Sequence, residues 1–197
     1  MEKLRIGLAL TGSYCTYDKA LAAAEALCKK YDVTAIMSET AAATDSRFGS
    51  AESFLARLEA MTGKAVLKTI VEVEPVGPQK MFDVLVIAPC TGNTAAKLAN
   101  GITDSCVTMA AKSHLRNGRP LLLAIGTNDG LSGSARNIGE LLGRKNIYFL
   151  PFYQDDPIGK PHSLASDYTS LERSILDALE GEQSQPILCG GQGRACG

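Results

Sequence analysis

The stretch that decides the fold runs from Asp83 to Thr94 and reads Asp-Val-Leu-Val-Ile-Ala-Pro-Cys-Thr-Gly-Asn-Thr. Its first half is a short apolar run rich in β-branched residues, which is typical of a strand buried on both faces of a parallel sheet. Pro89 is expected to end this strand. Thr91, Asn93 and Thr94 then offer hydroxyl and amide groups at the start of a helix, where free backbone N–H groups favour a phosphate. The junction therefore predicts an ordinary capped loop or an anion site.

The first expected strand, residues 4–10, ends in the same way, in a loop that reads Thr11-Gly12-Ser13. In an open α/β sheet, ligands bind outside the carboxyl ends of the strands, at the point where strand order reverses. The two loops together predict a nucleotide-like ligand. Their glycines do not match the dinucleotide fingerprint, because Gly7 lies inside the strand and no third glycine opens the helix. This spacing argues against NAD.

Strands and helices alternate along the rest of the chain. After residues 4–10, further strands are expected at residues 33–37, 67–73, 83–88, 120–125 and 147–152, and helices at 17–30, 53–61, 103–117, 134–144 and 166–180. This order predicts an α/β fold with a doubly wound, mostly parallel, six-stranded sheet in a Rossmann-like or flavodoxin-like three-layer sandwich. Residues 1–180 are expected to form one domain, and the Gly- and Gln-rich tail 181–197 is expected to be mobile.

Composition narrows the classes of partner. A net charge of −1 over 197 residues gives no electrostatic footprint for nucleic acid. The apolar runs are too short to span a bilayer, and the first residues show no signal-peptide pattern, so we expect no membrane association and a cytoplasmic location. Six dispersed cysteines with no Cys-x-x-Cys pair, and two histidines remote from any cysteine pair, favour reduced thiols and no metal site.

Three loops carry a family resemblance: Thr11-Gly12-Ser13, residues 88–94 and Thr127-Asn128-Asp129-Gly130-Leu131. Over roughly residues 4–155 the chain resembles the homo-oligomeric flavin-containing Cys decarboxylase family, which includes phosphopantothenoylcysteine decarboxylase and flavin prenyltransferase. The resemblance implies an FMN cofactor and a homo-oligomer built from trimers, in which neighbouring subunits cover the flavin. The residues expected to bind the cofactor are Gly12, Ser13, Ser38, Thr40, Pro89, Cys90, Thr91, Asn93, Thr94 and Asn128.

Within that family, residues 81–94 and 97–104 resemble one branch, the flavoprotein subunits of the two-subunit enzymes that make pyridine-2,6-dicarboxylate in spore-forming bacteria. The branch implies a second subunit of the NADPH-type Rossmann class and a dihydropyridine dicarboxylate precursor as substrate. It also implies the mother cell of a sporulating bacterium as the location. A flavin can accept the two electrons that are removed when the ring becomes aromatic.

The chain also departs from the decarboxylases. Those enzymes place a catalytic histidine shortly before the strand at 83–88, whereas residues 74–81 contain none, and Asn128 is the polar group retained from their motif after the next strand. Catalytic residues therefore stay unassigned. The candidate cations for substrate carboxylates are Lys80, Lys97, Arg116 and Arg136, each of which also fits a solvated surface charge.

Several alternatives stay open at the level of sequence. The chain is also compatible with an FMN-dependent decarboxylase or a flavin prenyltransferase relative, with a flavodoxin-like electron carrier, and with a non-catalytic partner whose flavin pocket is vestigial. Cys15 and Cys90 lie in the expected ligand-facing loops. Small loop or core residues are the commoner interpretation of such cysteines than a redox or nucleophilic role.

Overall fold

The computed structural model describes residues 3–190 of the chain, and its centre is a parallel sheet. The strands lie in the order β2-β1-β3-β4, with β5 pairing parallel to the first half of β4. Antiparallel β7 pairs with the last residues of β4, and β6 pairs with β7. The bounds are β1 Arg5–Leu10, β2 Asp32–Met37, β3 Val84–Cys90, β4 Leu121–Thr127, β5 Ile147–Phe149, β6 Phe152–Tyr153 and β7 Leu164–Ser166.

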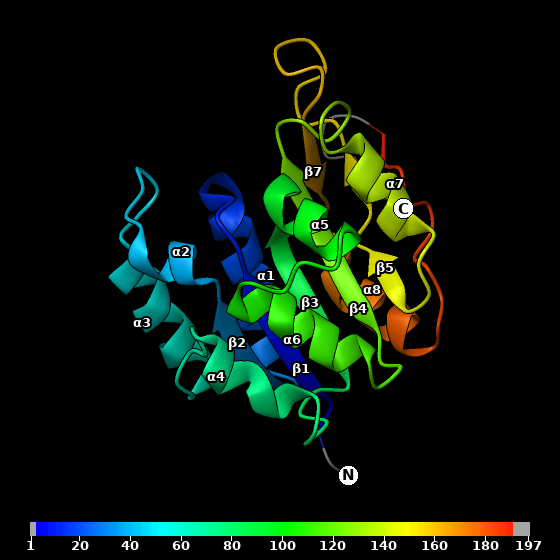
Figure 1. Cartoon of the computed structure of the whole chain (residues 1–197). Coiled ribbons are helices and arrows are strands. Elements are labelled where there is room, and N and C mark those ends of the chain that lie inside the picture. Colours follow the sequence, from blue (N-terminus) through cyan, green and yellow to red (C-terminus); the bar gives the residue numbers. More distant parts are fainter. Residues whose placement is uncertain (1–2, 191–197) are drawn as a thin grey trace.

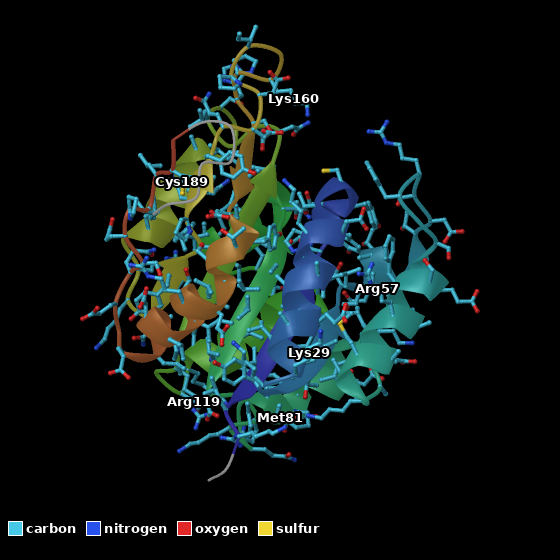
Figure 2. The ribbon with its side chains drawn as sticks, turned by 180° about the vertical axis from the view of Figure 1, so that it is seen from behind. Lys29, Arg57, Met81, Arg119, Lys160 and Cys189 are labelled. Atoms are coloured by element: carbon cyan, nitrogen blue, oxygen red, sulfur yellow. The ribbon has the colours of Figure 1, made fainter. Side chains whose placement is uncertain are left out.

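Helices cover both faces of the sheet, which confirms the three-layer α/β sandwich (Figure 1). One face packs against α1 (Tyr17–Cys28), α3 (Ala51–Thr62) and α8 (Leu171–Leu179), and the other against α4 (Ile70–Val73), α5 (Gly92–Ala99), α6 (Cys106–Leu115) and α7 (Ala135–Leu142). Figure 2 shows the first face from behind, with α1 and α8 over the strands. The short elements are α2 (Glu39–Ala43) and the 3-10 turns Tyr14–Thr16, Glu74–Val76 and Tyr168–Ser170.

Strand alternation explains why two cores form. In β3, Val84 and Val86 face the core under α1 and α8, whereas Leu85 and Ile87 face the core under α5 and α6. All seven residues of β3 are buried, as the apolar β-branched run predicted. Because β1 lies between β2 and β3, the strand order reverses at β1, and the loops that follow β1 and β3 meet at the carboxyl edge of the sheet.

The expected strand at residues 67–73 is wrong. Leu67 makes one isolated parallel bridge with Ile36, and the chain then turns into α4. Thr69 and Glu72 form a capping box, in which each side chain accepts a hydrogen bond from the other residue's backbone N–H. The β-branched residues Ile70 and Val71 favoured a strand, but the Thr-x-x-Glu cap satisfies the first N–H groups of a helix.

Three further boundaries differ from expectation. Pro89 does not end the strand, because β3 continues to Cys90 with a cis Ala88–Pro89 peptide and a shift of register against β4. The expected strand at 147–152 is divided into β5 and β6, and the expected helix at 166–180 begins only at Leu171, after β7. The sheet of the described residues therefore has seven strands where six were expected.

The first part of the tail, residues 183–189, is hydrogen-bonded to the sheet. The Gln183 side chain bonds both the N–H and the C=O of Phe149, and Phe152 exchanges backbone hydrogen bonds with Ile187 and Cys189. Cys189 is disulfide-bonded, so the expectation of reduced thiols fails there, whereas Cys15, Cys28, Cys90 and Cys106 are free. The rest of the expected tail, residues 191–197, lies outside the described residues.

Candidate functional site

A cavity of about 530 Å³ opens at the carboxyl edge of the sheet, where the strand order reverses. Its size lies within the usual range for small-molecule sites. Four segments line it: the loop after β1, the start of α5, the loop after β4 and a loop that follows α2. The lining residues are Gly12, Ser13, Tyr14, Cys15, Arg47, Phe48, Thr91, Gly92, Asn93, Gly126, Thr127, Asn128 and Asp129.

Thr11 holds the loops after β1 and β3 together. Its hydroxyl group donates to the Pro89 carbonyl at 2.8 Å and accepts from the Thr91 N–H at 3.1 Å. Thr11 is 3% exposed, so these hydrogen bonds form away from competing water. The buried hydroxyl group of Tyr17 donates to the Thr11 carbonyl at 3.0 Å, which ties the same loop to α1. The floor of the cavity is thus fixed by hydrogen bonds between segments about 80 residues apart.

Thr91 caps the helix that follows β3. Its hydroxyl oxygen accepts from the Thr94 N–H at 3.2 Å and lies 3.0 Å from the Thr94 hydroxyl group. Thr94 is therefore part of the cap and is 7% exposed. Gly92 and Asn93 in the first turn of α5 line the cavity. First-turn N–H groups have no partner inside a helix, and they favour an anion or a polar ligand.

Asp129 lies beside the start of α5. Its Oδ1 accepts from the Thr127 hydroxyl group at 2.5 Å and from the Ser134 hydroxyl group at 2.8 Å. The bond from Thr127 is the main reason that the pKa of Asp129 lies below its usual value, although burial opposes it. The group is close-packed, because a Cβ on Gly92 would lie 2.4 Å from Ser134 Oγ and 3.0 Å from Asp129 Oδ1. An ionised carboxylate therefore already occupies this side of the cavity.

Arg47 brings a positive charge to the cavity from the loop that follows α2. Its guanidinium carbon lies 4.8 Å from the centre of the Phe48 ring, a cation–π arrangement that orients the side chain. Arg47 and Asp129 are the charged groups among the lining residues. An anionic group of a ligand is thus favoured near Arg47 and disfavoured near Asp129.

A second cavity of about 480 Å³ adjoins the first and shares part of its lining, Ser13, Cys15, Gly126, Thr127 and Asn128. Its other walls come from β7 and from the segment before it, residues 155–163. Within residues 3–190 no group of three His, Cys, Asp or Glu side chains is arranged to hold a metal ion, and no helix is long and apolar enough to cross a membrane.

The structure brings half of the expected binding residues to the first cavity: Gly12, Ser13, Thr91, Asn93 and Asn128. The others lie elsewhere. Ser38 caps α2 by accepting from the Ala41 N–H, and Thr40 is exposed on that helix. Pro89 and Cys90 are buried in β3, where burial raises the pKa of the Cys90 thiol to about 12 and keeps it protonated.

Sequence reasoning missed Tyr14, Arg47, Phe48 and Asp129 in the first cavity. The Asn-Asp-Gly run was a signal for Asp129. No local motif marks Arg47, which lies in a loop distant in sequence from the three loops that follow the strands. The proposed substrate cations, Lys80, Lys97, Arg116 and Arg136, line neither cavity. Lys97, for example, pairs with Asp104 at 2.8 Å.

Comparison with known proteins identifies the family. A family model described as Flavoprotein matches residues 1–136. The chain belongs to the flavoprotein family. Within the family, it is 43% identical to the dipicolinate synthase B subunit of Bacillus subtilis over 185 residues, which are 93% of this chain and 92% of that protein. It also matches the crystal structure of the dipicolinate synthase B subunit from Bacillus halodurans, with 40% identity, a TM-score of 0.88 and coverage of 98% and 100% of the two chains.

A solved structure of lower sequence identity shares the fold. The crystal structure of SpaF, an FMN-dependent cysteine decarboxylase, is 22% identical and matches with a TM-score of 0.62 over 90% of this chain and 97% of that one. At this identity the likeness supports the family's fold and leaves the reaction of this chain to be argued from its own residues.

Proposed function

We propose that this chain is the FMN-binding subunit of a dipicolinate synthase and takes part in oxidising a dihydrodipicolinate-type intermediate to pyridine-2,6-dicarboxylate. The observation that carries the proposal is the meeting of the loops after β1, β3 and β4 around one cavity at the point where strand order reverses. The similarity to two dipicolinate synthase B subunits across nearly the whole chain supports the choice of reaction.

The residues of the first cavity fit FMN. A Cβ on Gly12 would meet only the Tyr14 ring, at 3.8 Å, so a ligand has room to approach the backbone of this loop. We place the phosphate near Gly12, Ser13 and Arg47, because Asp129 repels an anion.

In this arrangement bound FMN supplies a two-electron acceptor, and the chain supplies position and electrostatics. Thr11 and Thr91 fix the two loops that form the cavity floor. The exposed amides of Asn93 and Asn128 offer hydrogen bonds to the ribityl chain and the ring, respectively. The adjoining cavity provides space for a substrate beside the ring. No acid or base is assigned.

The proposal includes two kinds of assembly. Both similar chains are B subunits, so the dipicolinate synthase A subunit is the expected partner, and it would carry a separate NADPH-type activity. Copies of this chain are also expected to associate into a trimer-based homo-oligomer that covers the flavin. If the reaction is the one proposed, the pair acts in the mother cell of a sporulating bacterium.

Two measurements test the function. First, the cofactor released from purified protein is identified by mass and by its absorbance between about 350 and 500 nm, the range of oxidised flavin. FMN is expected, and NADP alone in the cavity would contradict the proposal. Second, formation of pyridine-2,6-dicarboxylate is measured with and without the A subunit. Release of CO₂ from a peptidyl cysteine would instead support a decarboxylase, and electron transfer without product would support a carrier.

A further inference from the structure

The second cavity has an apolar wall and a polar rim. The wall comes from Leu164 and Ala165 of β7 with Pro161 beside them, and the rim carries Asn128, Lys160 and His162. A flat ring can pack against such a wall, while charged substituents meet the rim. The cavity also shares Asn128 and Gly126 with the proposed flavin site, so a ring bound there lies next to the cofactor.

Hydrogen bonds hold the rim in place. The segment 154–163 protrudes from the end of the molecule above β7 in Figure 1, and Figure 2 labels Lys160 beside it. The Leu131 N–H donates to the His162 carbonyl at 3.0 Å, which ties this segment to the loop after β4. Gly130 permits the close approach, because a Cβ there would lie 2.7 Å from Leu164 Cδ1. His162 therefore sits on backbone fixed at the cavity mouth.

Lys160 has capacity for a further anion. Its Nζ lies 3.5 Å from Asp155 Oδ2, which is longer than a strong ammonium–carboxylate hydrogen bond. Burial alone would raise the pKa of Asp155, but a hydrogen bond from Ser163 and the charge of Lys160 outweigh it, so the pKa lies below its usual value and Asp155 stays ionised. The side chain of Lys160 is 60% exposed and keeps donors available for a ligand.

We infer that Lys160 and His162 recognise a carboxylate of a planar ring dicarboxylate that packs against Leu164 in the second cavity. The inference rests on the proposed function and specifies how its substrate is selected. The Lys160 ammonium supplies the charge, and the His162 imidazole supplies an N–H donor. Asp155 acts in the opposite direction, because its negative charge repels a dianion and competes for Lys160.

The test uses two substitutions with opposite expected effects. Pyridine-2,6-dicarboxylate is titrated into the FMN-loaded full chain, and its dissociation constant is measured by calorimetry. Lys160→Gln should raise this constant about fivefold, the upper range for a partly exposed ion pair. Asp155→Asn keeps the side-chain shape and should lower it, because the competing charge is gone. His162→Ala should raise it, and pyridine-2-carboxylate should bind more weakly than the dicarboxylate in the wild-type chain.

Lys145→Gln is the matched control, since it removes the same charge just before β5, at the amino edge of the sheet, and Lys145 lines neither cavity. The inference is overturned if the dissociation constants of the Lys160→Gln and Asp155→Asn variants equal that of the Lys145→Gln control. It is also overturned if the wild-type chain loaded with FMN does not bind the dicarboxylate. Failure of the proposed function is separate, because flavin absorbance would then be missing after reconstitution with FMN.

Discussion

In the proposed flavin site, Arg47 is the residue that we expect to bind the phosphate. It is the cation among the residues that line the first cavity, and it stacks on Phe48 in a loop that no strand-end motif marks. A guanidinium group binds phosphate through several N–H donors in a fixed geometry. Riboflavin has the ring and ribityl chain of FMN without the phosphate. The two ligands therefore separate the contribution of Arg47 from that of the rest of the site.

We expect Arg47→Gln to lower the affinity for FMN about fivefold, as for an exposed charge pair, and to leave the affinity for riboflavin unchanged. Fluorescence titration of apoprotein with each ligand measures both. Arg57→Gln is the control, because Arg57 lies on α3 away from this cavity (Figure 2). Equal losses for FMN and riboflavin would show that Arg47 acts through packing on Phe48 rather than through the phosphate.

Single residues also show how far sequence could predict the site. The loops after β1 and β3 were predictable, because polar residues directly follow buried strands and carboxyl ends of parallel strands share one edge. Ser38 was expected there for the same reason, but it caps α2. Arg47 could not be found, since the path of its loop depends on tertiary packing. The spacing also could not show that Thr94 completes the cap begun by Thr91.

At the scale of elements, the start of α5 and the loop after β4 are packed as one unit. Gly92 faces the hydroxyl groups of Thr127 and Ser134 and the carboxylate of Asp129. All three atoms belong to one hydrogen-bonded group, so none moves aside without breaking a bond. The helix start therefore depends on a residue without a side chain at position 92.

Gly92→Ala should lower the free energy of unfolding by about 1–3 kcal/mol, the usual cost of forcing an extra methyl group into a packed region. Gly139→Ala on α7 is the matched control, because a Cβ there meets nothing within 4 Å. The control should raise the free energy of unfolding by about 0.5–1 kcal/mol through helix propensity. Urea denaturation of both variants measures the difference, and a Gly92→Ala protein as stable as the control would contradict this packing.

Elements with clear periodicity and caps were predictable, and short elements at the sheet edge were not. The buried strands β1, β3 and β4 and helices α1 and α3 match their expected ranges within a few residues. The capping box at Thr69 and Glu72 was present in the sequence, but the β-branched residues between them favoured a strand. β6 and β7 consist of two and three residues, and only their pairing with β4 and each other defines them.

For the whole molecule, buried His114 links stability to pH. Burial is the main reason that its pKa falls from 6.5 to about 4, and the charge of Arg119 adds to the effect while a hydrogen bond with the Pro120 carbonyl opposes it. Between pH 6.5 and pH 4 the unfolded chain binds a proton that the folded chain does not. The free energy of unfolding therefore falls as pH is lowered through this window.

His114 accounts for a pH-dependent loss of about 3 kcal/mol in the free energy of unfolding, because its pKa differs by about 2.5 units between the unfolded and the folded chain. We expect wild-type protein to lose about 2 kcal/mol of unfolding free energy between about pH 7 and pH 5, and His114→Gln to lack this part of the loss. Denaturant titrations at the two pH values measure it. An identical loss in both proteins would show that other groups cause the dependence.

Assembly is the remaining prediction at this scale. Phe48 lines the first cavity and is 44% exposed, so one chain leaves part of the cavity lining open to solvent. We expect the FMN-loaded protein to be a homo-oligomer whose mass is a multiple of three chains, with closed symmetry. Light scattering at low micromolar concentration measures the mass. A monomer that retains FMN would show that one chain forms the complete pocket.

The protruding segment 154–163 is anchored at its end and exposed to solvent at its tip. Ile158 at the tip is 95% exposed, whereas Leu164 at its end is buried in β7. Exposed loop tips are where folded proteins are preferentially nicked by proteases. Within residues 3–190, brief digestion with a broadly specific protease should therefore make its first cut near Ile158. Because Lys160 and His162 stand on the same segment, a bound dicarboxylate should slow that cut, so a gel band would report occupancy of the second cavity without any measurement of turnover.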